Sequence, residues 1–310
     1  MPQQHPSEKP SPNVGLFITC LADMFRPSIG FATVKLLEQT GCRVSVPEQQ
    51  TCCGQPAYNT GDRRTSAEIA RMTIDAFAGY EYLVAPSGSC VGMIKYYPEL
   101  FDKEDPYQQL AQELADRSYE ITSFLFDVIG LEALQQQLQQ LSIPRTITYH
   151  DSCSGLRQLG IKQQPRELLK QIDGLQIEEM TEAETCCGFG GTFCVKYPEI
   201  SNRMVSNKSE FINDSGADTL VGGDLGCLLN MAGKLQRQTK DAPGELVEAR
   251  HVVELLADML DIPGIGEQEV RQLKDNVSAK NYALASELKS SELTGSELKT
   301  SAITAEQEAK

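Results

Sequence analysis

The sequence contains no tryptophan, only three histidines and no long apolar run. A membrane-spanning helix needs about 20 consecutive apolar residues, and no such stretch occurs. The opening residues, MPQQHPSEKPSP, are polar and rich in proline, unlike a secretory signal with its apolar segment. We therefore expect a cytoplasmic protein without a membrane span.

Basic residues are also scarce, because 28 lysines and arginines stand against 43 aspartates and glutamates, for a net charge of −15. Neutralising nucleic-acid phosphates requires clustered basic side chains, so the composition argues against a nucleic-acid binder. The sequence also lacks a P-loop, a nucleophile elbow, an HExxH motif and a dinucleotide-binding glycine fingerprint. These absences leave no recognisable site for a flavin or a nicotinamide cofactor.

Cysteine is abundant by contrast, with ten residues in a chain of 310. A reducing cytosol disfavours disulfides, and a chain of this length can bury a core without them. Cytosolic cysteines in such numbers are more often metal ligands or redox groups.

Eight of the ten cysteines form two copies of one pattern, C-x31-CCG-x36-C and C-x32-CCG-x39-C. Matching cysteines in the two copies lie 133, 134, 134 and 137 residues apart. Chance placement of two CCG triplets with matching flanks is very improbable, so the pattern indicates an internal duplication. The eight residues are Cys20, Cys52, Cys53 and Cys90 in the first copy, and Cys153, Cys186, Cys187 and Cys227 in the second.

Both copies alternate strand-like and helix-like segments. Strand-like runs precede the cysteines at 14–20, 43–46, 82–90, 147–153, 175–177 and 219–227. Helical periodicity lies between them, for example at 31–39, 65–78 and 200–212. This alternation predicts an α/β fold with a small parallel sheet in each copy, flanked by helices. Since ligands gather at the carboxyl ends of parallel strands, we expect the four thiols of each copy to converge there.

The duplication divides the chain into two domains and a tail. We place the first domain at 13–130 and the second at 144–260, joined by a helix-prone segment at 132–141 that ends before Pro144. Residues 262–310 are rich in Ser, Thr, Glu, Lys and Ala and form a low-complexity tail, which we predict to be disordered or partly helical.

Four thiolates per domain suit either zinc or an iron–sulfur cluster. Structural zinc sites usually present C-x2-C pairs, and this chain has none. Adjacent cysteines direct their side chains apart, which suits a cluster with several metal atoms better than one tetrahedral ion. Unliganded buried cysteines are a further alternative, but a duplicated quartet disfavours it. The residues thus favour iron–sulfur over zinc.

The double pattern resembles the CCG cysteine-rich domain, which occurs in heterodisulfide reductases, glycolate oxidase iron–sulfur subunits and lactate utilization proteins. The strings YHDSCSGLRQLGI (149–161) and TCCGFGGTFCVKYPEIS (185–201) are similar to the lactate utilization protein A family. A ferredoxin-like cysteine run, which glycolate oxidase subunits carry, is absent. The resemblance covers about residues 12–260.

That resemblance implies an electron-transfer subunit of a multi-subunit L-lactate dehydrogenase complex, with other iron–sulfur subunits as partners and any membrane association made through them. It leaves two alternatives, a catalytic subunit like those of heterodisulfide reductase or glycolate oxidase, and a non-enzymatic zinc protein. Broader family members often end with C-x-x-C, but Ser87 and Met93 flank Cys90 here, and Asp224 and Asn230 flank Cys227. One four-thiolate [4Fe–4S] cluster per domain is therefore the simpler expectation.

The remaining candidates lie outside the repeat. Cys194 has no counterpart after Cys53, and we interpret it as a free thiol rather than an extra ligand. Cys42 follows a helix end and is predicted to be structural. His150, with Asp151, precedes Cys153 and could tune a cluster, relay a proton in catalysis, or be a satisfied strand-end residue. His251 opens a helical segment as a surface or capping residue.

Overall fold

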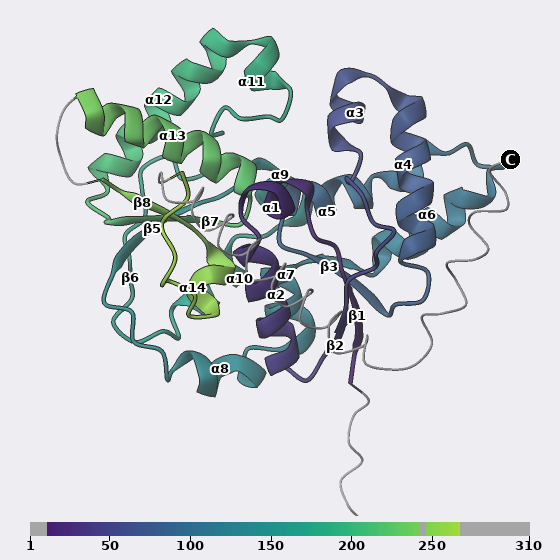
Figure 1. The fold of residues 1–310 in the computed structure, drawn as a ribbon, viewed down its shortest axis with the longest axis horizontal. Helices are drawn as coiled ribbons and strands as arrows, with labels where there is room; N and C mark the ends of the chain where they lie inside the picture. The colour runs from purple at the N-terminus through teal and green to yellow at the C-terminus, as the bar shows by residue number, and fades with distance from the viewer. Residues whose placement is uncertain (1–10, 242–245, 267–310) are drawn as a thin grey trace, which may run out of the picture. The chain divides into compact units, whose positions relative to one another are not determined.

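The computed structural model describes residues 11–241 and 246–266, which contain two four-stranded sheets (Figure 1). The first has the strand order β2-β1-β3-β4, and all of its pairings are parallel. Its strands are β1 (Asn13–Leu16), β2 (Arg43–Ser45), β3 (Tyr82–Ala85) and β4 (Ser118–Glu120). The helical segments of this repeat are α1 (Cys20–Phe25), α2 (Ser28–Gln39), α3 (Gln55–Thr60), α4 (Arg63–Ala76), α5 (Gly88–Lys95), η1 (Tyr97–Leu100), α6 (Pro106–Asp116), α7 (Ile121–Ser123), the π-helical η2 (Phe124–Ile129) and α8 (Glu132–Leu138).

The second sheet repeats this topology, with the order β6-β5-β7-β8 and parallel pairing throughout. Its strands are β5 (Thr146–His150), β6 (Gln176–Ile177), β7 (Thr219–Gly222) and β8 (Glu248–His251). Its helices are α9 (Cys153–Leu159), α10 (Gln163–Leu169), α11 (Phe193–Lys196), α12 (Pro198–Asp214), α13 (Leu225–Asp241) and α14 (Val252–Leu256). The predicted tandem α/β architecture is confirmed.

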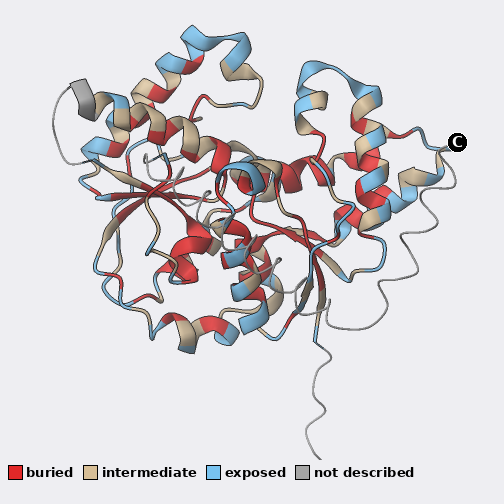
Figure 2. Ribbon diagram, viewed as in Figure 1, coloured by how far each residue is buried: buried red, intermediate tan, exposed pale blue. Residues whose placement is uncertain are grey.

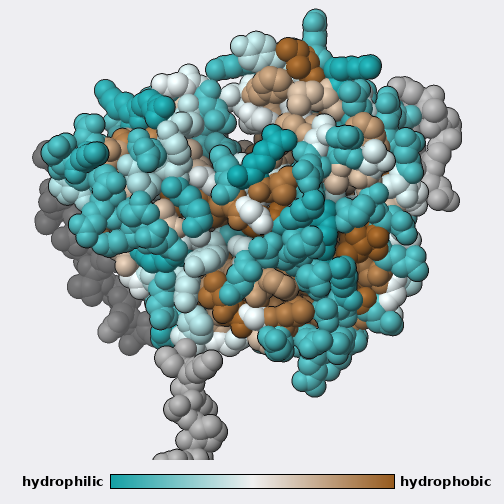
Figure 3. Space-filling view, turned by 180° about the vertical axis from the view of Figure 1, so that it is seen from behind, coloured by the Kyte–Doolittle hydropathy of each residue, from teal (hydrophilic) through white to brown (hydrophobic). Residues whose placement is uncertain are grey.

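The central strands of both sheets are almost wholly buried, whereas α3 buries no residue (Figure 2). Seen from behind, hydrophilic side chains cover most of the surface and separate its apolar patches (Figure 3).

Within the described residues, none of the helices combines the length and apolar character needed to cross a bilayer. Of the predicted tail at 262–310, all but the first five residues lie outside the part that the structure describes.

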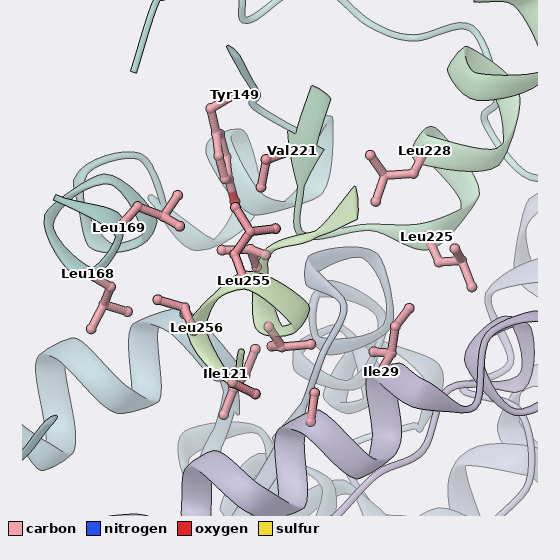
Figure 4. Packing of buried hydrophobic residues seen from close by; sticks show 14 of the residues in the cluster. Ile29, Ile121, Tyr149, Leu168, Leu169, Val221, Leu225, Leu228, Leu255 and Leu256 are labelled. Atoms are coloured by element: carbon pink, nitrogen blue, oxygen red, sulfur yellow. The ribbon is translucent and has the colours of Figure 1, made fainter. Parts of the chain in front are cut away.

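One apolar core runs through both repeats. It includes Ile29 and Ile121 from the first repeat together with Leu225, Leu255 and Leu256 from the second. Figure 4 shows these side chains gathered around α14. The described residues accordingly belong to one compact unit, and the division at 13–130 and 144–260 stays a prediction of where each repeat begins and ends.

A buried ion pair joins the turn between α1 and α2 to α14 across the two repeats. The guanidinium of Arg26, the C-cap residue of α1, donates from Nε to Glu254 Oε1 at 2.7 Å, and Ser28 Oγ at the start of α2 donates to the same oxygen at 2.7 Å. Arg26 Nη1 also donates to the Pro263 carbonyl at 2.6 Å. Glu254 caps its own helix as well, because its Oε2 accepts from the backbone N–H of His251 at 3.1 Å. The C-terminal end of the second repeat is thereby fixed to the first.

We predict that Glu254→Gln lowers the free energy of unfolding by about 3 kcal/mol, because it leaves the buried Arg26 charge without its counterion. Urea denaturation followed by circular dichroism measures this loss. Arg64→Ala, which removes the exposed Arg64–Glu68 pair on α4, is the control and should hardly move the midpoint. Equal midpoints for the two variants would contradict the structural role given to Glu254.

Candidate metal centres

The first cysteine of each repeat begins a helix directly after a central strand. Cys20 opens α1 behind β1, and Cys153 opens α9 behind β5. The preceding residues cap these helices, because Thr19 Oγ1 accepts from the Ala22 N–H at 3.4 Å and Ser152 Oγ accepts from the Gly155 N–H at 3.2 Å. Such caps satisfy otherwise unpaired amides and fix where each helix starts. The thiols are therefore held at the carboxyl ends of the strands.

The glycine of each CCG triplet adopts a left-handed backbone, with φ of 83° at Gly54 and 82° at Gly188. Glycine alone populates this region freely, so the triplet can turn sharply after two cysteines. At Gly188 a side chain is also excluded by packing, since an added Cβ would lie 2.7 Å from the Ser201 carbonyl oxygen of α12. Ser201 Oγ donates to the Gly188 carbonyl at 2.8 Å, which fastens this turn to the helix.

The last cysteine of each repeat lies in the first turn of a helix, Cys90 in α5 and Cys227 in α13. Ser87 caps α5 by accepting from the Cys90 N–H at 3.3 Å. Ser87 and Asn230 are two of the four residues that flank the last cysteines without supplying an extra thiol. Asn230 instead donates from Nδ2 to the Cys187 carbonyl at 2.9 Å, and so stabilises the second CCG turn.

The thiols of each repeat converge into a quartet, as the strand topology predicts. In the first quartet Cys20 and Cys52 sulfurs lie 4.0 Å apart, and side-chain hydrogen bonds connect Cys52 to Cys53 and Cys53 to Cys90. The second quartet is connected in the same order, and all eight thiols are free of disulfides. Its links join Cys153 to Cys186, Cys186 to Cys187, and Cys187 to Cys227.

These contacts concentrate negative charge on one sulfur of each quartet. Hydrogen bonds from Cys20 and Cys53 lower the pKa of Cys52 to about 3, and hydrogen bonds from Cys153 and Cys187 lower that of Cys186 to about 2. The Gly188 N–H also approaches Cys186 Sγ at 3.4 Å. Four converging sulfurs, one of them with a lowered pKa, form a donor set for a thiophilic metal, so the residues fit an iron–sulfur cluster at each quartet.

Both quartets open into one cleft of about 490 Å³. Gln55, Asn59, Gln158 and Phe189 complete part of its wall. The cysteines that line it are Cys20, Cys52, Cys53, Cys90, Cys153, Cys186, Cys187 and Cys227. Groups held by the two quartets would thus face the same space.

Asp224 joins the two repeats between the quartets. Its Oδ1 accepts from Ser87 Oγ at 2.6 Å and from Ser89 Oγ at 2.8 Å, both at the start of α5. Ser87 and Asp224 are matching positions, each three residues before the last cysteine of its repeat. Nearby, α5 and α9 approach so closely that a Cβ on Gly88 would lie 2.9 Å from the Gly155 Cα. The cysteine-bearing segments themselves therefore form one of the contacts between the repeats.

His150 lies beside the second quartet. One of its ring nitrogens and the sulfurs of Cys187 and Cys227 all lie within 4.8 Å of one another. The side chain is 1% exposed, and neither ring nitrogen has a hydrogen-bond partner among the described residues. Burial, reinforced by the nearby Lys208 charge, lowers its pKa to about 3, so the ring is neutral. A catalytic role for His150 stays a prediction.

Lys208 of α12 is a neighbour of this quartet that the cysteine pattern does not reveal. Its side chain is fully buried, and its Nζ donates to the carbonyls of Glu182 at 2.7 Å and Ala183 at 2.8 Å, just before the CCG turn. Burial lowers its pKa to about 8, and the charge of Cys187 opposes that shift. The ammonium form therefore predominates at pH 7. Aligning the buried positions of α4 with those of α12 identifies Lys208 as an internal residue.

The other candidates take structural roles in the described residues. Asp151, which follows His150 at the strand end, is buried in a bidentate ion pair with Arg166 at 2.8 and 3.0 Å. Cys194 Sγ donates to the Gly191 carbonyl at 3.2 Å, and Cys42 lies in the apolar core, where burial raises its pKa. His251 caps α14 as predicted, but its alternative as a surface residue is wrong, because β8 ends inside the core.

Comparison with known proteins agrees with this geometry. Residues 14–95 and 147–232 each match the family model of the cysteine-rich domain CCG. Lactate utilization protein A of Halalkalibacterium halodurans is 47% identical over 243 residues, which are 78% of this chain and 96% of that protein. Its namesake from Bacillus subtilis is 43% identical over 243 residues, covering 78% of this chain and 98% of that protein.

A solved structure shares the fold at much lower identity. The crystal structure of a hypothetical protein from Helicobacter pylori superposes with a TM-score of 0.53 at 14% identity, over 88% of this chain. The chain spans about half of that protein's length, 53%. The likeness supports the fold alone, whereas the curated relatives match nearly end to end. The chain belongs to the lactate utilization protein A family and carries the cysteine-rich CCG domain twice.

Proposed function

We propose that the chain is an iron–sulfur electron-transfer subunit of a multi-subunit system that oxidises L-lactate to pyruvate. The observation that carries this proposal is the single cleft lined by two complete thiol quartets. The name of the curated relatives supplies the link to lactate. We further propose that each quartet holds one [4Fe–4S] cluster, which supplies one-electron chemistry when bound.

The side chains and backbone of each quartet suit that group. Cys52 and Cys186 already carry thiolate character, and metal binding would release the protons shared by their neighbours. The amides of Gly188 and Phe189 lie 3.4 and 3.5 Å from the sulfurs of Cys186 and Cys187. Hydrogen bonds to sulfur raise the reduction potential of an iron–sulfur site, so this turn favours electron uptake.

Oxidising lactate removes two electrons and two protons, and hydride acceptors are usually flavins or nicotinamides. The sequence carries no fingerprint for either, so we assign the primary acceptor to a partner subunit. The net charge of −15 suits docking to a basic partner and repels free lactate from most of the surface. On this account the chain receives electrons rather than binding the substrate.

A catalytic role like that of heterodisulfide reductase is the competing proposal. Its extra thiol next to the last cysteine is missing here, where Ser87 and Asp224 hold the repeats together by a hydrogen bond instead. Four thiols per site are sufficient for electron transfer. Zinc in the same quartets is the other alternative, and metal analysis separates it.

We predict about eight irons and about eight sulfides per anaerobically reconstituted chain, as two [4Fe–4S] clusters require. Cys52→Ser and Cys186→Ser should each remove about half of both, together with half of the visible absorbance, because each opens a different quartet. Cys42→Ser is the matched control and should remove none, since Cys42 lies in the core. Two zincs without sulfide, or loss of iron in Cys42→Ser, would contradict the assignment.

We also predict that the iron-loaded chain alone does not oxidise L-lactate with an artificial electron acceptor, because it lacks a hydride acceptor. The same preparation should be reduced by dithionite and reoxidised by that acceptor, which shows that its redox groups are competent. Pyruvate formed by the isolated chain would refute pure electron transfer and favour the catalytic alternative.

A further inference from the structure

The two quartets have the same cysteines but different buried neighbours. His150 lies three residues before Cys153, and the matching residue before Cys20 is Phe17. Phe17 is fully buried, and its ring lies 5.8 Å from that of Phe77. An imidazole thus faces the second quartet, whereas the matching position of the first repeat holds an apolar ring.

The helices behind the CCG turns differ in the same way. The four buried residues of α4 correspond to four of the five buried residues of α12, at a constant separation of 135 positions. The pairs are Ser66 with Ser201, Ala70 with Val205, Thr73 with Lys208, and Ile74 with Ser209. In the first repeat Tyr97 OH approaches Thr73 Oγ1 at 3.4 Å and donates to the Cys53 carbonyl at 2.9 Å. A neutral hydroxyl pair therefore replaces the lysine there.

Lys208 is held where its charge acts on the second quartet. Its Nζ donates to two backbone carbonyls, Glu182 and Ala183, and an ammonium has a third N–H to offer. Cys187, Asp151, Cys227 and Cys153 are all within its electrostatic reach. Among the described residues no ion pair joins Lys208 to a carboxylate, and the nearby Asp151 is paired with Arg166 instead. The sulfurs of the second quartet thus lie within reach of a fixed, buried positive charge.

A buried positive charge stabilises whichever redox state carries more negative charge. A cluster on four thiolates gains one negative charge on reduction, and low local polarity strengthens its attraction to a fixed cation. The His150 ring, with a nitrogen within 4.8 Å of the Cys187 and Cys227 sulfurs, can donate an N–H hydrogen bond to a sulfur of the same site, which acts in the same direction. Neither contribution exists at the matching positions of the first quartet.

We infer that Lys208, assisted by His150, gives the second quartet the higher reduction potential and so directs electrons from the first quartet to the second. The inference rests on the proposed function, because it needs a reducible group at both sites. In that transfer one electron leaves the first site, which is oxidised, and enters the second, which is reduced; no bond breaks and no proton moves. Lys208 acts on the reduction potential of the second site through its charge and is not a ligand.

The test is an EPR-monitored redox titration of the full, iron-loaded chain. Cys186→Ser and Cys52→Ser assign the two midpoints, because each retains one site. In the wild type the higher midpoint should be the one that Cys186→Ser abolishes. Lys208→Met should lower that midpoint so that the reduced-to-oxidised ratio at a fixed poise falls at least about tenfold, which is 59 mV for one electron. Lys208→Arg, which keeps the charge, should restore most of it.

Two controls separate charge from structure. Thr73→Val, at the matching position of the first repeat, should move neither midpoint, and Lys208→Met should leave the Cys52-dependent site unchanged. A lower wild-type potential at the Cys186-dependent site would overturn the inference without any Lys208 variant, even if Lys208→Met fails to fold. An unchanged midpoint in a folded, loaded Lys208→Met would overturn it too. Absence of reducible iron at either site would instead refute the proposed function.

Discussion

The convergence of four thiols at the carboxyl edge of each sheet is the constraint around which this chain is built. In each quartet, hydrogen bonds from neighbouring thiols lower the pKa of one cysteine, Cys52 or Cys186. Burying thiolate charge without a partner lowers the stability of the fold, and a bound metal cation offsets that loss. The capped helices, the glycine turns and the strand ends all serve to hold these sulfurs in place, which is why the cysteine pattern survives in both repeats with nearly constant spacing.

The duplication produces two related sites and also the contacts that hold them together. The matching residues Ser87 and Asp224 bind each other, α5 meets α9 at paired glycines, and Arg26 of one repeat binds Glu254 of the other. These contacts turn both quartets toward one cleft, so two redox groups would share a short path. Small departures from the repeat, a lysine for a threonine and a histidine for a phenylalanine, then suffice to make the two sites unequal.

The sequence allowed the duplication, the two parallel sheets and the convergence of thiols to be predicted, because cysteine spacing and strand–helix alternation are local signals. It did not reveal the contact between repeats, since nothing in the spacing shows that Ser87 reaches Asp224 or that Arg26 reaches Glu254. The sequence did not predict the burial of Lys208 either, because a lysine on an amphipathic helix ordinarily faces water. Only the burial of the matching positions on α4 and α12 shows that this lysine is internal. His251 was expected to cap a helix, but its depth depends on β8 joining the sheet.

The measurement that tests the account most directly is the EPR spectrum of the dithionite-reduced, iron-loaded chain. Two clusters that share one cleft should give a spectrum broadened or split by spin–spin interaction, and Cys52→Ser and Cys186→Ser should each simplify it to the signal of one isolated centre. Two independent signals that simply add in the wild type, or no iron–sulfur signal at all, would contradict the claim that both quartets hold redox groups facing the same space.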